Sequence, residues 1–152
     1  MKEIKLKLAE FMQLFDELAG FNNQEGKQIE GILSSKMSLS TRYWLDNILK
    51  QCSTEKESVE KIKNELISKL GTPSEDGQSI MIPTYLESGD INPSFVEFST
   101  EFGKLLEEEK TLTFKEIPVS LLDTIETELH CQVFFKLVEA SNQTTPPIEE
   151  QA

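Results

Sequence analysis

The sequence has no long apolar run, only two cysteines and a single histidine among its 152 residues. No stretch approaches the ~20 consecutive apolar residues that a transmembrane helix needs, and the first segment, MKEIKLKLAEF, lacks the apolar core of a signal peptide. Cys52 and Cys131 are not in a CxxC spacing, and each lies within a helical pattern. We therefore expect a soluble, cytosolic protein with two buried, reduced thiols.

Residues that carry out chemistry are equally scarce. The seven glycines are scattered at turns, so no glycine-rich phosphate loop precedes a helix. His130 and Cys131 are adjacent, and neighbours on a helix point about 100° apart, so they would not act together as base and nucleophile. Glu107, Glu108 and Glu109 lack the Asp, Asn and Gly pattern of a calcium loop. The sequence predicts a protein that is not an enzyme and has no metal site and no cofactor.

Basic residues become rare in the second half of the chain. Residues 1–71 contain 11 Lys and Arg against 11 Asp and Glu, whereas residues 72–152 contain 4 against 16. The second half therefore accounts for the whole net charge of −12. Such a surface repels phosphate backbones, so we expect no direct nucleic-acid binding. The acidic half either keeps the protein soluble or imitates a nucleic acid in the basic groove of a partner.

A long helix is predicted around the stretch STRYWLDNILKQC, residues 40–52, which contains the only tryptophan. Ser38 or Ser40 can cap its first turn, and Gly71 followed by Pro73 ends it. At a rise of ~1.5 Å per residue, about thirty residues span ~45 Å. One apolar stripe follows the helical period: Trp44, Ile48, Cys52, Val59, Ile62, Leu66 and Leu70.

Residues 92–108 provide a partner helix. Asn92 can cap it and Pro93 suits its first turn, and its apolar stripe consists of Phe95, Phe98, Phe102, Leu105 and Leu106. These phenylalanines are more typical of a core than of a base-stacking platform. We expect the two helices to pack as a long antiparallel hairpin.

The remaining patterns complete the predicted fold. Residues 111–117 alternate as a strand, which could pair with a short strand at residues 80–83 or with one near residues 4–8. A short closing helix contains Cys131 and Phe134. The fold class is thus α+β, mainly α, with a long antiparallel helical hairpin, a small β-sheet and a short C-terminal helix. We expect one domain over residues 1–139 and a disordered acidic tail over residues 140–152.

Four segments carry a resemblance to a known family: TRYWL, ELISKLGTPSEDG, INPSFVEFSTEFGKLLEEEKTLTFKEI and FFKLV. Together they resemble a group of small proteins of tailed bacteriophages, similar to the DUF1617-like group and especially its relatives in phages of Bacteroides-type hosts. The resemblance covers roughly residues 1–139. It implies a phage origin, a location in the host-cell cytoplasm or the virion, a mostly helical fold with a little sheet and no known activity, and it transfers no site residues.

Two functions follow from these observations. The first is a virion accessory or assembly component whose helical hairpin binds another phage structural protein. The second is an acidic inhibitor of a host defence protein. Trp and Tyr are enriched in interface hot spots, and exposed carboxylates steer association. The expected partner-binding residues are therefore Tyr43, Trp44, Glu97, Glu101, Glu107, Glu108 and Glu109. The sequence leaves open the partner, the oligomeric state and the face that binds.

Overall fold

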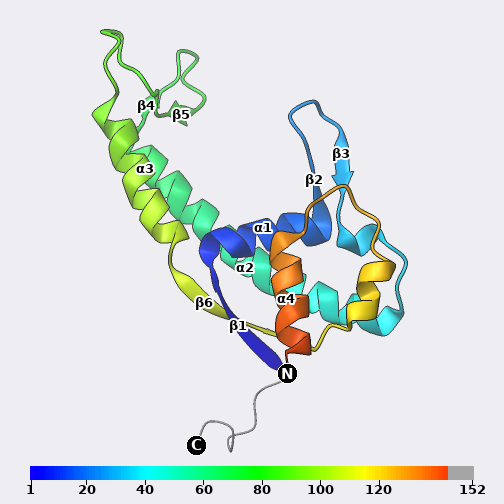
Figure 1. Ribbon diagram of the computed structural model, residues 1–152. Coiled ribbons are helices and arrows are strands. Elements are labelled where there is room, and N and C mark those ends of the chain that lie inside the picture. The colour runs from blue at the N-terminus through cyan, green and yellow to red at the C-terminus, as the bar shows by residue number, and fades with distance from the viewer. Residues whose placement is uncertain (144–152) are drawn as a thin grey trace, which may run out of the picture.

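The structure is a computed structural model that describes residues 1–143. It is an α+β protein, mainly helical, with four α-helices and three two-stranded sheets among these residues (Figure 1). The elements follow one another as β1 (Lys2–Lys7), α1 (Leu8–Ala19), β2 (Gly20–Asn22), β3 (Gln28–Glu30), the 3-10 turn η1 (Ile32–Ser34), α2 (Leu39–Leu70), β4 (Thr72–Pro73), β5 (Ile80–Met81), α3 (Pro93–Leu106), β6 (Glu109–Phe114), the 3-10 turn η2 (Val119–Asp123) and α4 (Gln132–Asn142).

The long helix α2 begins and ends where the sequence predicts. The Ser38 side chain accepts a hydrogen bond from the Thr41 backbone N–H at 3.1 Å, which satisfies one of the free amides of the first turn. At the other end the Gly71 N–H donates to the Ile67 carbonyl at 2.7 Å. Between these caps α2 is continuous over 32 residues, so this prediction is confirmed.

The sheet that positions the core pairs β1 with β6, in antiparallel register with Ile4 opposite Leu112. This settles the pairing that the sequence leaves open in favour of the N-terminal strand. The other edge of β6 faces α2, where the Gln51 amide donates to the Thr113 carbonyl at 2.7 Å and accepts from the Thr113 N–H at 3.3 Å. One side chain of α2 thus takes the place of a neighbouring strand at this point of the edge.

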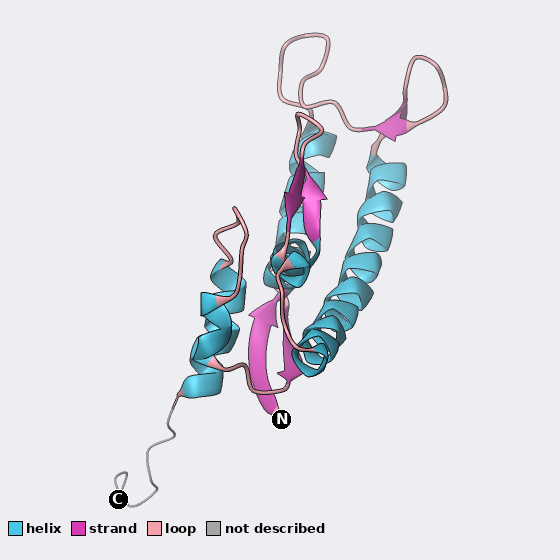
Figure 2. Cartoon of the chain, turned by 90° about the vertical axis from the view of Figure 1, so that its right-hand side faces the viewer, coloured by secondary structure: helices cyan, strands magenta, loops and turns pink. Residues whose placement is uncertain are grey.

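The apolar core lies at one end of the molecule, where α1 crosses the first half of α2 and α4 covers α1 and β1 (Figure 1). The largest side chains that it buries completely are Leu6, Phe11, Leu14, Leu18, Ile32, Leu45, Ile48, Leu112, Phe114, Phe134 and Leu137. We call residues 1–59 and 107–143 the body. Residues 60–106, which comprise the second half of α2, the loops after it and α3, extend away from the body and are called the arm (Figure 2).

The predicted long hairpin is correct only in part. The main partner of α2 is α1, whereas α3 packs along the second half of α2 and makes a smaller contact with α1. Within α3 none of the 14 residues is buried, and Phe95, Phe98 and Phe102 are half-buried. The burial of the predicted apolar stripe also changes along α2. The stripe faces the core as far as Val59, whereas Ile62 is exposed.

The closing helix is longer than predicted. α4 continues to Asn142, and the buried Ser141 hydroxyl accepts from the Ile117 N–H at 2.9 Å and donates to the Leu137 carbonyl at 2.9 Å. α4 thus extends three residues past residue 139, where we expected the domain to end. Of the predicted acidic tail, residues 144–152 lie outside the described residues. None of the helices within residues 1–143 is long and apolar enough to cross a membrane.

Candidate interaction surfaces

At the start of α2, Tyr43 and Trp44 form an aromatic pair, and Trp44 borders a small hollow in the body. Tyr43 is 62% exposed, and its ring meets Trp44 edge to face with 5.0 Å between the ring centres. Trp44 is half-buried, and the Lys115 ammonium lies 5.1 Å from its ring centre. The hollow has a volume of about 200 Å³, and Trp44 lines it together with Leu45, Ile48, Ile117, Pro118 and Leu121. It is large enough for one side chain of a partner, and too small for a drug-sized ligand.

The predicted acidic residues of α3 border a groove of the arm. Glu97 and Glu101 line this groove of about 300 Å³ together with Ile62, Leu66, Lys69, Phe102 and Leu105. The Phe98 and Phe102 rings stack with their centres 5.5 Å apart. Phe102 and Leu105 of the α3 stripe thus form part of the wall of an open groove, and together with Leu106 they also pack against the core as partly buried side chains. Carboxylates and apolar groups lie side by side there, as in the rim and centre of a protein interface.

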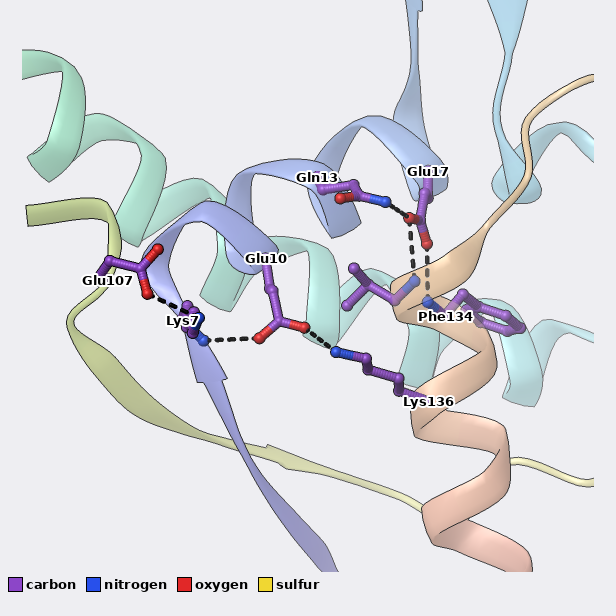
Figure 3. A network of polar contacts seen from close by, with 8 residues as sticks. Lys7, Glu10, Gln13, Glu17, Glu107, Phe134 and Lys136 are labelled. Carbon is purple, nitrogen blue, oxygen red and sulfur yellow. Dashed lines mark hydrogen bonds and ion pairs between the residues drawn. The ribbon is translucent and has the colours of Figure 1, made fainter. Parts of the chain in front are cut away.

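The three consecutive glutamates have a structural role at the junction of α3 and β6. Glu107 forms an ion pair with Lys7 at 2.7 Å (Figure 3), and this hydrogen bond and its charge raise the pKa of Lys7. The Glu108 carbonyl accepts from the Leu8 N–H at 2.8 Å, and Glu109 lies opposite Lys7 in the sheet. All three side chains remain exposed. No group of three metal-ligating side chains exists within residues 1–143.

The cysteines have the properties of buried thiols. Burial raises the pKa of Cys52 to about 12 and that of Cys131 to about 11, so neither is a thiolate near neutral pH. His130 is exposed, whereas Cys131 is buried at the start of α4 with a left-handed backbone (φ 52°). The His130 side chain is therefore open to solvent and the Cys131 side chain is not. Because the Cys131 thiol stays protonated near neutral pH, it is not an active nucleophile.

Sequence reasoning missed Glu17, a carboxylate that is only 4% exposed. Its two oxygens accept from the backbone N–H groups of Val133 (3.2 Å) and Phe134 (2.8 Å), and Gln13 donates to it at 2.9 Å (Figure 3). Cys131, at the cap position of α4, has no capping side chain, so α1 supplies the cap from across the core. The available signal was an acidic residue beside Leu14 and Leu18 on the apolar face of α1.

The predicted partner-binding residues thus lie in three places. Tyr43 and Trp44 lie on the body, Glu97 and Glu101 on the arm, and Glu107, Glu108 and Glu109 at the junction between them. Family models, curated proteins and solved structures were all compared with the chain, and none matches it. The resemblance to phage proteins therefore stays a prediction.

Proposed function

We propose that this chain is a non-enzymatic phage protein that acts by binding another protein, and that the arm makes the contact. The observation that carries the proposal is the exposure of α3. Its sequence has an apolar stripe suited to burial, yet none of its residues, 93–106, is buried. Fully burying a Phe or Leu side chain contributes about 1.5–3 kcal/mol. The Phe and Leu side chains of α3 are only half-buried, so they gain only part of this free energy in the free protein. A partner that covers the arm would supply the rest.

In this proposal the second half of α2 and α3 act together as the projecting hairpin. The arm has the form of an adaptor element, because it stands clear of the body and exposes an apolar groove rimmed by carboxylates. Together with the family resemblance, this form favours a virion accessory or assembly component that contacts another phage structural protein. The protein would act in the host-cell cytoplasm during assembly or remain in the virion.

Mass spectrometry of purified virions tests this role. We expect the chain at a fixed copy number relative to the major structural proteins. An assembly factor that leaves the particle would instead appear in purified precursor particles. Absence from both kinds of particle would reject the structural role.

The charge of the arm supports a second candidate, an acidic inhibitor of a host defence protein. Residues 72–103 contain six acidic residues and no lysine or arginine, namely Glu75, Asp76, Glu87, Asp90, Glu97 and Glu101. A protein that imitates nucleic acid competes with it for the same basic groove. Addition of a short DNA duplex to the purified complex should then release the chain. If the duplex leaves the complex intact, this alternative is rejected.

A further inference from the structure

The loops at the end of the arm form two ordered hairpins. We call residues 71–92 the tip. Its first hairpin pairs β4 with β5, and the Ser74 N–H closes the turn by donating to the Ser79 carbonyl at 2.7 Å. The Asp76 carboxylate accepts hydrogen bonds from the Ser74 hydroxyl and the Gln78 N–H, and these bonds lower the pKa of Asp76. The first turn is thus organised by its own side chains.

The second hairpin covers residues 84–92 and joins α3 directly. Tyr85 and Ile91 pair across an antiparallel bridge, and the Leu86 N–H donates to the Asp90 carbonyl at 2.8 Å. Gly89 has φ 90°, a conformation that few side chains tolerate, and its N–H donates to the Leu86 carbonyl at 2.9 Å. Asn92 caps α3 and also donates to the Pro83 carbonyl at 2.9 Å. This hairpin is therefore preorganised before any partner arrives.

Large apolar side chains of the tip point to solvent despite this order. Tyr85 is 62% exposed and Ile91 59%, and Ile80, Met81 and Leu86 are exposed as well. Residues opposite each other in an antiparallel bridge have their side chains on the same face, so Tyr85 and Ile91 form one exposed apolar pair. Tyrosine is enriched among the residues that dominate binding energy at interfaces. Ordered turns that expose such a pair are typical of a docking site.

The charge around this pair restricts what can cover it. Glu87 and Asp90 lie on the same hairpin, and the nearest basic residues along the chain are Lys69 and Lys104. An anionic membrane or a nucleic acid would be repelled, and the tips of two copies would repel each other. A surface with lysine or arginine at its rim would be attracted and steered toward the tip.

From these observations we propose that the tip docks Tyr85 and Ile91 into an apolar pocket of a different protein, and that lysine or arginine residues rim this pocket. The inference rests on the proposed binding function and names both the contact and the chemistry of the partner. The apolar pair supplies the affinity, and Glu87 and Asp90 set the association rate.

The two tyrosines provide a matched test, because Tyr43 on the body and Tyr85 on the tip are equally exposed at 62%. A photo-crosslinking amino acid is placed at position 43 or 85 of the full chain in the cells that express it. Adducts are identified by mass spectrometry, and the captured protein is then purified and titrated with the chain. We expect position 85 to yield a partner. Tyr85→Ala should weaken its binding at least tenfold, and Tyr43→Ala less than twofold.

Two further measurements examine the charge and the fold. Reversal of both carboxylates, Glu87→Lys with Asp90→Lys, should slow association several-fold at low salt and reduce its dependence on salt. Because all these side chains are exposed, each variant should melt within about 2 °C of the wild type. A variant that melts lower is replaced by Tyr85→Ser or by the single reversals, so that binding is compared between folded proteins.

The outcomes separate the inference from the proposed function. Adducts from position 43 alone would overturn the tip inference and the assignment of the contact to the arm, and would leave only a protein-binding function standing. No adduct from either position would contradict the binding function as well. A captured partner that binds Tyr85→Ala as tightly as the wild type overturns the inference. The same holds if the adduct is a second copy of the chain. Tyr85-dependent cosedimentation with phosphatidylglycerol vesicles would also overturn it, in favour of a membrane surface.

Discussion

The two halves of α2 belong to the same helix but have opposite environments. In the body, Leu45, Ile48 and Cys52 are buried against α1 and the β1–β6 sheet, whereas beyond Val59 no residue of α2 is buried. The same helical period thus serves a closed core at one end and an open groove at the other. This difference indicates that the body holds the fold, and it is the basis of our proposal that the arm binds a partner.

Among the described residues, the ion pairs and hydrogen bonds through which a charged side chain joins two helices lie in the body. In the body, Glu17 caps α4 from α1, and Glu10 joins the same two helices through Lys136 (Figure 3). In the arm, the Glu101–Lys104 pair at 3.6 Å joins neighbours on a single helix and has both side chains more than half exposed. Exposed pairs of this kind contribute little, whereas buried hydrogen bonds to a charged group contribute about 1.5–3 kcal/mol.

The largest expected effect comes from matched leucine truncations in the two regions. Leu14→Ala removes a fully buried side chain of α1 and should lower the free energy of unfolding by about 3–5 kcal/mol. Leu66→Ala, in the half-buried wall of the arm groove, should lower it by about 1 kcal/mol or less. Urea denaturation of both variants measures the difference. Equal losses would mean that the arm is part of the core.

A smaller loss of stability is expected when the hydrogen bonds between Glu17 and the first turn of α4 are weakened. Glu17→Gln replaces one carboxylate oxygen by an amide NH₂ group, which would face a backbone N–H of α4. The free energy of unfolding should fall by about 1–3 kcal/mol. Glu101→Gln on the arm is the control and should change it by less than about 0.5 kcal/mol. A Glu17→Gln protein as stable as the wild type would show that α4 does not depend on this cap.

The smallest expected effect depends on pH and concerns Glu10. Burial alone would raise the pKa of Glu10, but hydrogen bonds from Lys136 and the Lys7 backbone N–H, with the attraction of both lysines, lower it overall. Its contribution is therefore present above the unfolded pKa of about 4.3 and disappears as the pH falls through the lower folded value. Glu10→Gln should lose under about 1 kcal/mol at pH 7. Its deficit against the wild type should shrink as the pH falls below the unfolded pKa, and a deficit that grows on acidification would contradict this assignment.

Local signals predicted the helices better than their partners. The cap at Ser38, the stop at Gly71 and the Asn92–Pro93 start of α3 each act within one turn, so the sequence reveals them. An apolar stripe shows that a helix needs a partner but does not identify it. Here α1, with Phe11, Leu14 and Leu18, occupies the position on α2 that we expected α3 to fill.

The partner-binding role of Tyr43, Glu97 and Glu101 stays a prediction. The structure shows only that Tyr43 is exposed and that Glu97 and Glu101 border a groove. The apolar pair Tyr85 and Ile91 was missed because apolar residues in a linker are usually assigned to the core. Glu17 was missed because its partners are backbone N–H groups more than 110 residues away, which no local pattern identifies.

Native-state hydrogen exchange tests most directly the claim that the body holds the fold and the arm is left for a partner. Amides of α1, α4 and the first half of α2 should exchange only with global unfolding. Those of α3 and of α2 after Val59 should exchange through openings of clearly lower free energy, and more slowly once the partner is bound. If α3 amides in the free protein were as protected as those of α1, the arm would be part of the cooperative core and the account would be wrong.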